Sequence, residues 1–489
     1  MSTDADKKLR AQKLLIELLG ESQGLPTKIG QFLSMKEEAD ELQEALNASV
    51  NPMPWEEVVE ILNREYGGDF HTVFRNIKPQ ARPASLGQVH PGTLKNGQPV
   101  AIKIQYLGIK EKVDSELKIL GWLPGMGPMK KWGMDLAGYI RELREHLDQE
   151  LDYTREADQQ VRYREKWGDR SDVIVPKVYP EYSNEKVLVQ AFEKGQTLEK
   201  VIGLPQEKRQ EIGKIWVSHI LFMLFHKGIM HSDPNPLNFA FRTKGRSPGI
   251  VLYDFGSLFE VTQSERMLLL RIILAIRNRE NIDPAQCLKG LGFDLEKLND
   301  IRHCLPGLLA VLFEPFIQDE PFDFDDWNIN KRWDDIVGDL KWWFRSAAPP
   351  RVIFLMRTFH GLVNHLGKLK VSISWSFLLD DVAGDLFEQA SEWPLPEFDE
   401  NEEAANFDGL SRYLKIDVRK GNGNRVELTM PARVAENLEE VIDPPVLESI
   451  KNQNIDLESV QKRIQRSGFQ SQILLEMEDS VRKVKVWLE

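Results

Sequence analysis

The sequence predicts an α+β fold: a two-lobed body, an N-terminal helical extension and a small C-terminal α/β module. Three observations support this prediction. Short runs rich in β-branched residues begin after about residue 68, and helical periodicity dominates from 205 to about 390. A pattern of two strands, two helices and two strands then closes the chain. Its 489 residues are enough for two or three domains with a substantial core.

Changes of composition along the chain divide it into five predicted parts. Helical periodicity at the N-terminus is interrupted by prolines, and the stretch WPLPEFDENEEAANFD has the acidic, proline-containing composition of a linker. The parts are a helical extension (1–65), an N-lobe with inserted long helices (66–193), a helical C-lobe (194–392), an acidic linker (393–409) and a small α/β module (410–489).

Individual elements follow from local patterns. The turn signal Lys95-Asn96-Gly97 precedes the alternating, β-branched run GQPVAIKIQYL, which predicts a hairpin. An acidic helical stretch is expected over about 135–166, with strands at 173–180 and 186–192. In the C-terminal module, LKIDVRK and RVELTM flank GNGN and form a second predicted hairpin. Two short helices and the alternating runs QILLEME and RKVKVWLE complete a ββααββ pattern.

The composition restricts location and partners. A formal net charge of −13 disfavours nonspecific nucleic-acid binding and gives no general attraction to anionic lipid. The cysteines, Cys287 and Cys304, lack the spacing of a zinc site or a disulfide framework. The N-terminus lacks the apolar stretch of a signal peptide, and the apolar run at 215–225 is too short to span a bilayer. A soluble, cytoplasmic protein is therefore expected.

A lysine and a glycine-containing turn form the first candidate site. Val100 to Lys103 (VAIK) is a strand ending in a lysine, which can pair with nucleotide phosphates; alone it is more often an ordinary lysine whose stem lies along apolar surface. The upstream stretch PASLGQVHPG offers Ser85, Gly87 and Gln88, whose backbone N–H groups can approach phosphates. With one central glycine, this phosphate loop is a weak signal in isolation.

The stretch HSDPNPLNFAF, with VLYDFG a few residues later, carries the strongest signal. Its prolines and asparagines would suit a plain surface turn. However, Asp233 and Asn238 have the spacing of a kinase catalytic loop, and Asp254 begins an Asp-Phe-Gly after a predicted strand. In that arrangement Asp233 lies beside the attacking hydroxyl, while Asn238 and Asp254 bind Mg²⁺. Together with Lys103, in this order, these residues predict a site for ATP and Mg²⁺.

Departures from ordinary protein kinases concern the protein substrate. Ser232 stands where an arginine would precede the loop aspartate, and no Ala-Pro-Glu follows Asp-Phe-Gly. The chain instead passes quickly into the helical run SERMLLLRIILAI. The segment that would hold a peptide is therefore absent, and we expect little phosphorylation of proteins.

The chain resembles the UbiB/ADCK (AarF-like) atypical kinases of the protein-kinase-like superfamily over about residues 20–390. This resemblance implies a protein-kinase-like bilobal fold. The motifs that carry it are KIGQ from Lys28 to Gln31, PASLGQVH, VAIK, Glu150-Leu151-Asp152 with the following Glu156, HSDPNPLN and DFG.

The resemblance assigns roles to the acidic helix, which could otherwise be a solvated face. It implies that Glu156 pairs with Lys103, with Glu150 as the alternative, and that Glu150 and Asp152 contact Lys28 and Gln31. The helix at 20–35 would then lie across the peptide site.

A further expected contact involves adenine, which would meet backbone groups of the hinge from Gln190 to Glu193, including Phe192. Asn235 and Leu237 replace the usual His and Gly of the family loop. They leave the expected metal ligands unchanged, so this departure concerns the efficiency of turnover and not the expected binding of nucleotide.

By resemblance, the expected function is Mg-ATP-dependent ATPase or kinase chemistry in isoprenoid lipid or ubiquinone metabolism. Two alternatives stay open: a small-molecule or lipid kinase, and a non-catalytic, nucleotide-gated scaffold whose C-terminal module recruits an unidentified partner. The segment 121–134, rich in Trp, Met and Leu, is expected to fold onto the core. Its alternative is an apolar lip for a lipid ligand or for peripheral membrane contact.

Overall fold

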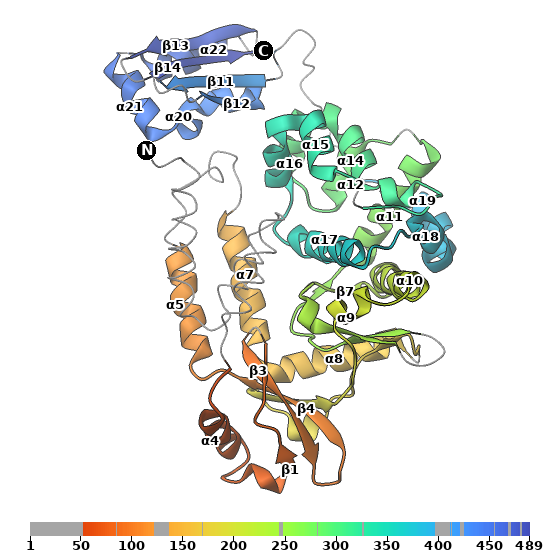
Figure 1. The fold of residues 1–489 in the computed structure, drawn as a ribbon. Helices are drawn as coiled ribbons and strands as arrows, with labels where there is room; N and C mark the ends of the chain where they lie inside the picture. Colours follow the sequence, from red (N-terminus) through yellow and green to blue (C-terminus); the bar gives the residue numbers. More distant parts are fainter. Residues whose placement is uncertain are drawn as a thin grey trace. The chain divides into compact units, whose positions relative to one another are not determined.

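The computed structural model describes most of the chain beyond residue 51 (Figure 1). The described residues are 52–396 and 411–489, apart from gaps at 85, 122–135, 169, 244–247, 281, 325–326, 412, 421–424, 454, 468–470 and 480–481. Most of the predicted extension, the segment around 121–134 and most of the acidic linker therefore lie outside the described residues. Among the described residues, no helix combines the length and apolar character needed to cross a bilayer.

The chain forms two compact units, each assembled from separate stretches of sequence. The first contains the described residues before 124 together with 137–261 and 351–373, and the second contains 262–350 and 374–489. The first unit therefore depends on a segment, 351–373, that returns to it after a long helical excursion.

The first unit contains a five-stranded antiparallel sheet in the order β1-β3-β4-β6, with β2 paired to β3. Its strands are β1 (Phe74–Ile77), β2 (Arg82–Pro83), β3 (Gly87–Leu94), β4 (Pro99–Gln105) and β6 (Val187–Ala191). The predicted hairpin is present as β3 and β4, and Gly97 in its turn has φ of +87°, a conformation that favours glycine.

The smaller strands of this unit flank the two sequence motifs. They are β5 (Val173–Ile174), β7 (Ile229–His231), β8 (Phe239–Arg242), β9 (Gly249–Leu252) and β10 (Leu258–Glu260). β8 and β9 pair with each other, and β7 pairs with β10. The strand expected at 173–180 is short because Pro176 lacks the N–H that a sheet ladder needs.

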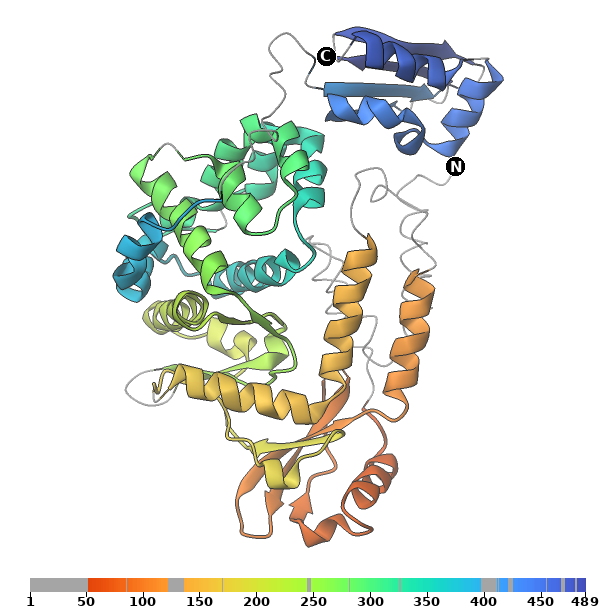
Figure 2. The same cartoon turned by 180° about the vertical axis from the view of Figure 1, so that it is seen from behind.

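The helices of the first unit frame the sheet and the loops. They are α4 (Trp55–Glu65), α5 (Ile109–Gly121), α7 (Leu136–Glu150), α8 (Tyr153–Trp167), α9 (Leu198–Ile202), α10 (Gln206–Phe222) and α17 (Val352–Leu369). Helices α5 and α7 lie side by side in both views, linked by Arg144 and Asp114 at 3.1 Å (Figures 1 and 2).

The single helix expected over about 135–166 is in fact two helices. α7 ends at Glu150, and the Asp152 side chain accepts hydrogen bonds from the backbone N–H groups of Thr154 and Arg155 at the start of α8. An aspartate in this position satisfies orphan donors of a new helix, so it ends one helix and starts another. The break gives α8 an axis of its own.

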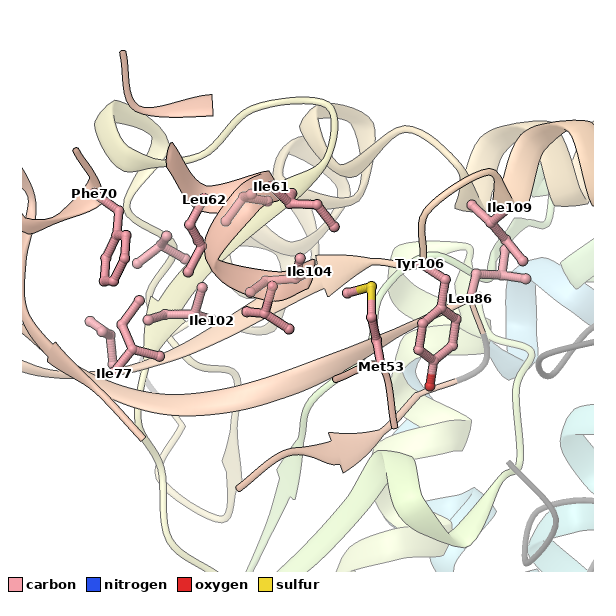
Figure 3. Packing of buried hydrophobic residues seen from close by; sticks show 14 of the residues in the cluster. Met53, Ile61, Leu62, Phe70, Ile77, Leu86, Ile102, Ile104, Tyr106 and Ile109 are labelled. Atoms are coloured by element: carbon pink, nitrogen blue, oxygen red, sulfur yellow. The ribbon is translucent and has the colours of Figure 1, made fainter. Parts of the chain in front are cut away.

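The sheet and α4 share a hydrophobic core. Ile61 and Leu62 of α4 and Ile102 and Ile104 of β4 are buried in it together with Met53 (Figure 3). The alternation of β4 places Ile102 and Ile104 in this core and turns Lys103 to the opposite face. The core thereby fixes the direction of Lys103.

The second unit contains a helical part followed by the C-terminal module. Its helices are α11 (Gln263–Asn278), α12 (Pro284–Gly290), α13 (Leu295–Asp300), α14 (Leu305–Leu312), α15 (Ile329–Val337), α16 (Lys341–Ala347), α18 (Trp375–Ala383) and α19 (Phe387–Ser391). α11 begins with a capping box formed by Thr262 and Glu265, six residues after Gly256.

The C-terminal module has the predicted order of two strands, a helical segment and two strands, but the first of the two expected helices is divided into α20 (Leu438–Val441) and α21 (Pro444–Asn452). Its strands are β11 (Tyr413–Lys420), β12 (Arg425–Pro431), β13 (Gln472–Glu478) and β14 (Arg482–Leu488), in the antiparallel order β12-β11-β14-β13. The helix that follows them is α22 (Leu457–Ser467). Strand residues such as Ile416 and Val486 share a core with these helices, and Trp343 of α16 packs against it.

Gly361 of α17 provides a test of the packing. A Cβ at this position would lie 2.0 Å from the Pro234 Cβ, so Gly361→Ala should destabilise the protein by about 1–3 kcal/mol through overpacking. Gly384→Ala is the matched control, because nothing lies within 4 Å of its Cβ position. Thermal unfolding of both variants checks this, and equal midpoints would contradict the close contact of α17 with Pro234.

Candidate functional site

A buried ion triad joins the sheet, helix α8 and the Asp-Phe-Gly segment. The Lys103 Nζ lies 2.8 Å from both carboxylate oxygens of Glu156 and 2.7 Å from the Asp254 Oδ2. Lys103 is 6% exposed and Glu156 is fully buried. Of the two helix acids considered for Lys103, Glu156 is therefore the one that pairs with it, whereas the Glu150 Oε1 lies 3.2 Å from the His146 Nε2.

The triad has one more negative than positive charge. Burial and the Asp254 carboxylate together raise the pKa of Glu156 to about 7, although Lys103 and the Phe255 backbone N–H oppose the shift. Burial also disfavours the charge of Lys103, but Asp254 and Glu156 outweigh it and raise the pKa of the ammonium. In neutral solution this cluster can accept either a proton or a further cation.

The loop from β7 to β8 brings Asp233 and Asn238 together. The Asn238 Nδ2 donates to the Asp233 Oδ2 at 3.0 Å, and the backbone N–H of Asn235 donates to the Asp233 Oδ1 at 3.3 Å. The Asn235 side chain accepts from the Leu237 N–H and caps a short 3₁₀ turn, Pro236–Asn238. Asn235 thus shapes the loop, while the side chain of Leu237 is 57% exposed.

Helix α17 supports this loop from behind. The His365 Nε2 lies 2.8 Å from the Pro234 carbonyl oxygen, and the Thr358 hydroxyl donates to the His231 carbonyl at 3.1 Å. The Asp254 carbonyl oxygen in turn lies 2.5 Å from the His231 Nε2. These contacts fix the loop at 231–238 and the Asp-Phe-Gly segment relative to each other.

Arg357 of α17 is a site residue that the sequence analysis missed. Its guanidinium lies 3.8 Å from the Asp233 Oδ1 and is 10% exposed. Burial lowers the pKa of Arg357, while the charges of Asp233 and Glu150 oppose that shift. An arginine therefore does lie beside Asp233. It comes from helix α17, which is distant in the sequence, and not from position 232, where kinases carry it and this chain has Ser232.

The motif acids Glu150 and Asp152 have local contacts. Glu150 is buried, and its Oε1 lies 3.2 Å from the His146 Nε2. That His146 nitrogen also lies 2.9 Å from the Ser257 hydroxyl. Asp152 caps α8. Lys28 and Gln31 lie outside the described residues, so their contact with these acids stays a prediction.

The predicted phosphate loop is only partly described. Ser85 lies outside the described residues. Gly87 begins β3, where a Cβ would lie 2.7 Å from the Tyr153 hydroxyl oxygen. Gln88 is fully buried inside β3, and its side-chain oxygen accepts from the Met53 N–H at 2.6 Å. The Gln88 side chain therefore holds the segment before α4.

The predicted hinge begins within the last residues of β6, which ends at Ala191. The Gln190 side chain is buried, accepts from the Gln160 Nε2 at 2.6 Å and donates to the Tyr253 carbonyl at 3.2 Å. The Phe192 N–H donates to the Pro99 carbonyl at 3.2 Å and thus ties the hinge to β4. The Gln190 side chain and the Phe192 N–H therefore both have hydrogen-bond partners within the protein.

Comparison with known proteins gives a consistent result. Residues 45–286 match the family model of the ABC1 atypical kinase-like domain. The chain is 27% identical to "Atypical kinase coq-8, mitochondrial" of Caenorhabditis elegans over 383 residues, which cover 75% of this chain and 50% of that protein. It is 29% identical to "Atypical kinase COQ8, mitochondrial" of Saccharomyces cerevisiae over 372 residues, which cover 73% of each. The chain thus spans between half and three quarters of these relatives.

A solved structure shows the same fold. The structure of Rv3197 with erythromycin, from Mycobacterium tuberculosis, has a TM-score of 0.53 and 24% identity to this chain. The match covers 78% of this chain and 97% of that one. This similarity, together with the family model, confirms the predicted kinase-like α+β fold.

The raised pKa of Glu156 predicts a pH dependence of stability. Because this pKa is about 7 in the folded protein and 4.5 ordinarily, the folded state binds more protons between these values, and Glu156 contributes a loss of stability as the pH rises through them. Glu156→Gln should remove this contribution and change the pH dependence of the melting temperature by about 2–4 °C. Glu145→Gln, on α7, is the control, and parallel pH profiles for Glu156→Gln and the unaltered chain would contradict the assignment.

Proposed function

The chain belongs to the ABC1 (UbiB/ADCK) family of atypical kinase-like proteins, and on this basis we propose that it binds Mg-ATP and acts as a phosphotransferase or ATPase. The observation that carries this proposal is the buried triad of Lys103, Glu156 and Asp254. In kinases the lysine contacts nucleotide phosphates, and its acidic helix partner keeps it in place.

The residues present fit a magnesium ion. Asn238 uses its Nδ2 to bond Asp233, which leaves its carbonyl oxygen available for a cation. Asp254 adds a carboxylate, and hard oxygen ligands from protein and phosphate are the set that Mg²⁺ prefers. We propose that Asn238 and Asp254 hold Mg²⁺, which when bound neutralises charge on the phosphates.

Asp233 and Arg357 would act on the attacking group. A carboxylate held by the Asn235 N–H and the Asn238 amide can orient a hydroxyl or a water molecule and accept its proton. Arg357 fixes this carboxylate electrostatically from α17. We propose that Arg357 is a positioning residue for Asp233.

The nature of the acceptor follows from what surrounds the site and from the family. The residues directly after Asp-Phe-Gly form β10, which pairs with β7, and α11 begins at Gln263. This leaves little chain to form a peptide platform, so we propose that the acceptor is water or a small molecule. Membership of the family supports a role in isoprenoid lipid or quinone metabolism.

Asp254→Asn tests the metal site. The change should lower Mg-ATP affinity by about tenfold or more, because the amide replaces the charged ligand, while the fold is retained. Asp294→Asn is the control, since Asp294 caps α13 and asparagine is an equally good cap. Calorimetric titration with and without Mg²⁺ measures both. Unchanged Mg-ATP affinity in Asp254→Asn would refute the metal assignment.

Arg357 can be tested separately from nucleotide binding. Arg357→Met should lower kcat for ADP release by about tenfold to a hundredfold, because Asp233 loses its orientation, with little change in the Kd of Mg-ATP. Arg357→Lys keeps the charge and should recover part of the rate. Arg351→Met, just before the same helix, is the control. Equal kcat values for Arg357→Met and the unaltered chain would exclude a positioning role.

A further inference from the structure

We propose that the Tyr153 hydroxyl donates a hydrogen bond to the phosphates of the bound nucleotide. This inference rests on the proposed function. It adds a side-chain contact with phosphate to a site whose predicted phosphate loop has one central glycine, Gly87. Two structural observations lead to it: the state of this hydroxyl and its position.

The Tyr153 hydroxyl is buried without a hydrogen-bond partner among the described residues. Tyr153 is the first residue of α8 and is 1% exposed. Buried hydroxyl groups normally find a partner, so an unpaired one needs an explanation. Tyr163, about three turns along the same helix, shows the ordinary case, because its hydroxyl lies 2.8 Å from the His219 Nε2. An incoming ligand would provide the missing partner of Tyr153.

The position of this hydroxyl is between the two features expected to meet phosphates. A Cβ on Gly87 would lie 2.7 Å from the hydroxyl oxygen and 2.3 Å from the Ile104 carbonyl oxygen, so only glycine leaves room there. The Lys103 Nζ lies 4.9 Å from the centre of the Tyr153 ring. The phenol therefore touches the end of the phosphate loop at one side and the triad lysine at the other.

The chemistry of a phenol suits a phosphate. Phosphate oxygens are acceptors, so the hydroxyl must remain protonated in order to donate. Burial, together with the nearby Glu156 and Asp254 carboxylates, raises the pKa of Tyr153, although Lys103 opposes this shift. A hydrogen bond to an anionic oxygen is stronger than one between neutral groups. The Lys103 ammonium lies over the face of the same ring, so the ammonium and the hydroxyl are close enough to bind one phosphate group.

Tyr153→Phe removes the hydroxyl and nothing else, so it separates ligand binding from packing. The Kd of Mg-ATP for the full chain should rise about tenfold, as expected for losing a hydrogen bond to a charged group. Without nucleotide, the melting temperature should stay the same or rise, because an unpaired buried hydroxyl is lost. Tyr163→Phe is the matched control: it should lower the melting temperature and leave the Kd unchanged.

The outcomes distinguish this inference from the proposed function. If the unaltered chain and Tyr163→Phe bind Mg-ATP and Tyr153→Phe binds it equally well, the inference is wrong and the proposed function stands. A loss of stability in Tyr153→Phe with unchanged Kd would overturn the inference too, because the hydroxyl would then bond within the protein. Failure of the unaltered chain to bind Mg-ATP would refute the proposed function, and this inference with it.

Discussion

The ion triad of Lys103, Glu156 and Asp254 holds three separate parts of the first unit at one point. Lys103 comes from β4, Glu156 from α8 and Asp254 from the segment after β9. Burying these charges is costly, and leaving one of them unpaired costs still more, so the three elements are stable only when the charges meet. The sheet core that directs Lys103, the cap that starts α8 and the supports of the Asp-Phe-Gly segment all serve this meeting.

A second constraint is that the loop from His231 to Asn238 is held from outside as well as by its own hydrogen bonds. Its support comes from α17, through Thr358, His365 and the close contact of Gly361 with Pro234. This explains why residues 351–373 return to the first unit after the chain has formed most of the helices of the second. The same return brings Arg357 to Asp233 and so provides the cation that position 232 lacks.

The sequence was sufficient where a motif is local. Lys103 follows from a strand pattern, and the presence of Asp233 and Asn238 in one loop follows from their fixed spacing. It was insufficient where the fold brings distant residues together. Glu150 and Glu156 were alternatives as partners of Lys103 because the break between α7 and α8 at Asp152 was not predicted. Nothing in the motifs pointed to Arg357, nor to the role of the Gln88 side chain, which accepts a hydrogen bond from the Met53 N–H.

The charges of the site bear directly on the proposed binding of Mg-ATP. Lys103 lies between Glu156 and Asp254, while Arg357 faces Asp233 and Glu150, so two fixed cations meet four carboxyl groups. In a buried site such an excess of negative charge repels a triphosphate strongly. Protonation of Glu156, whose pKa is raised to about 7, relieves only one of these charges. Under the proposed function, phosphate binding at Lys103 would therefore depend on a divalent cation held by the oxygen atoms of Asn238 and Asp254.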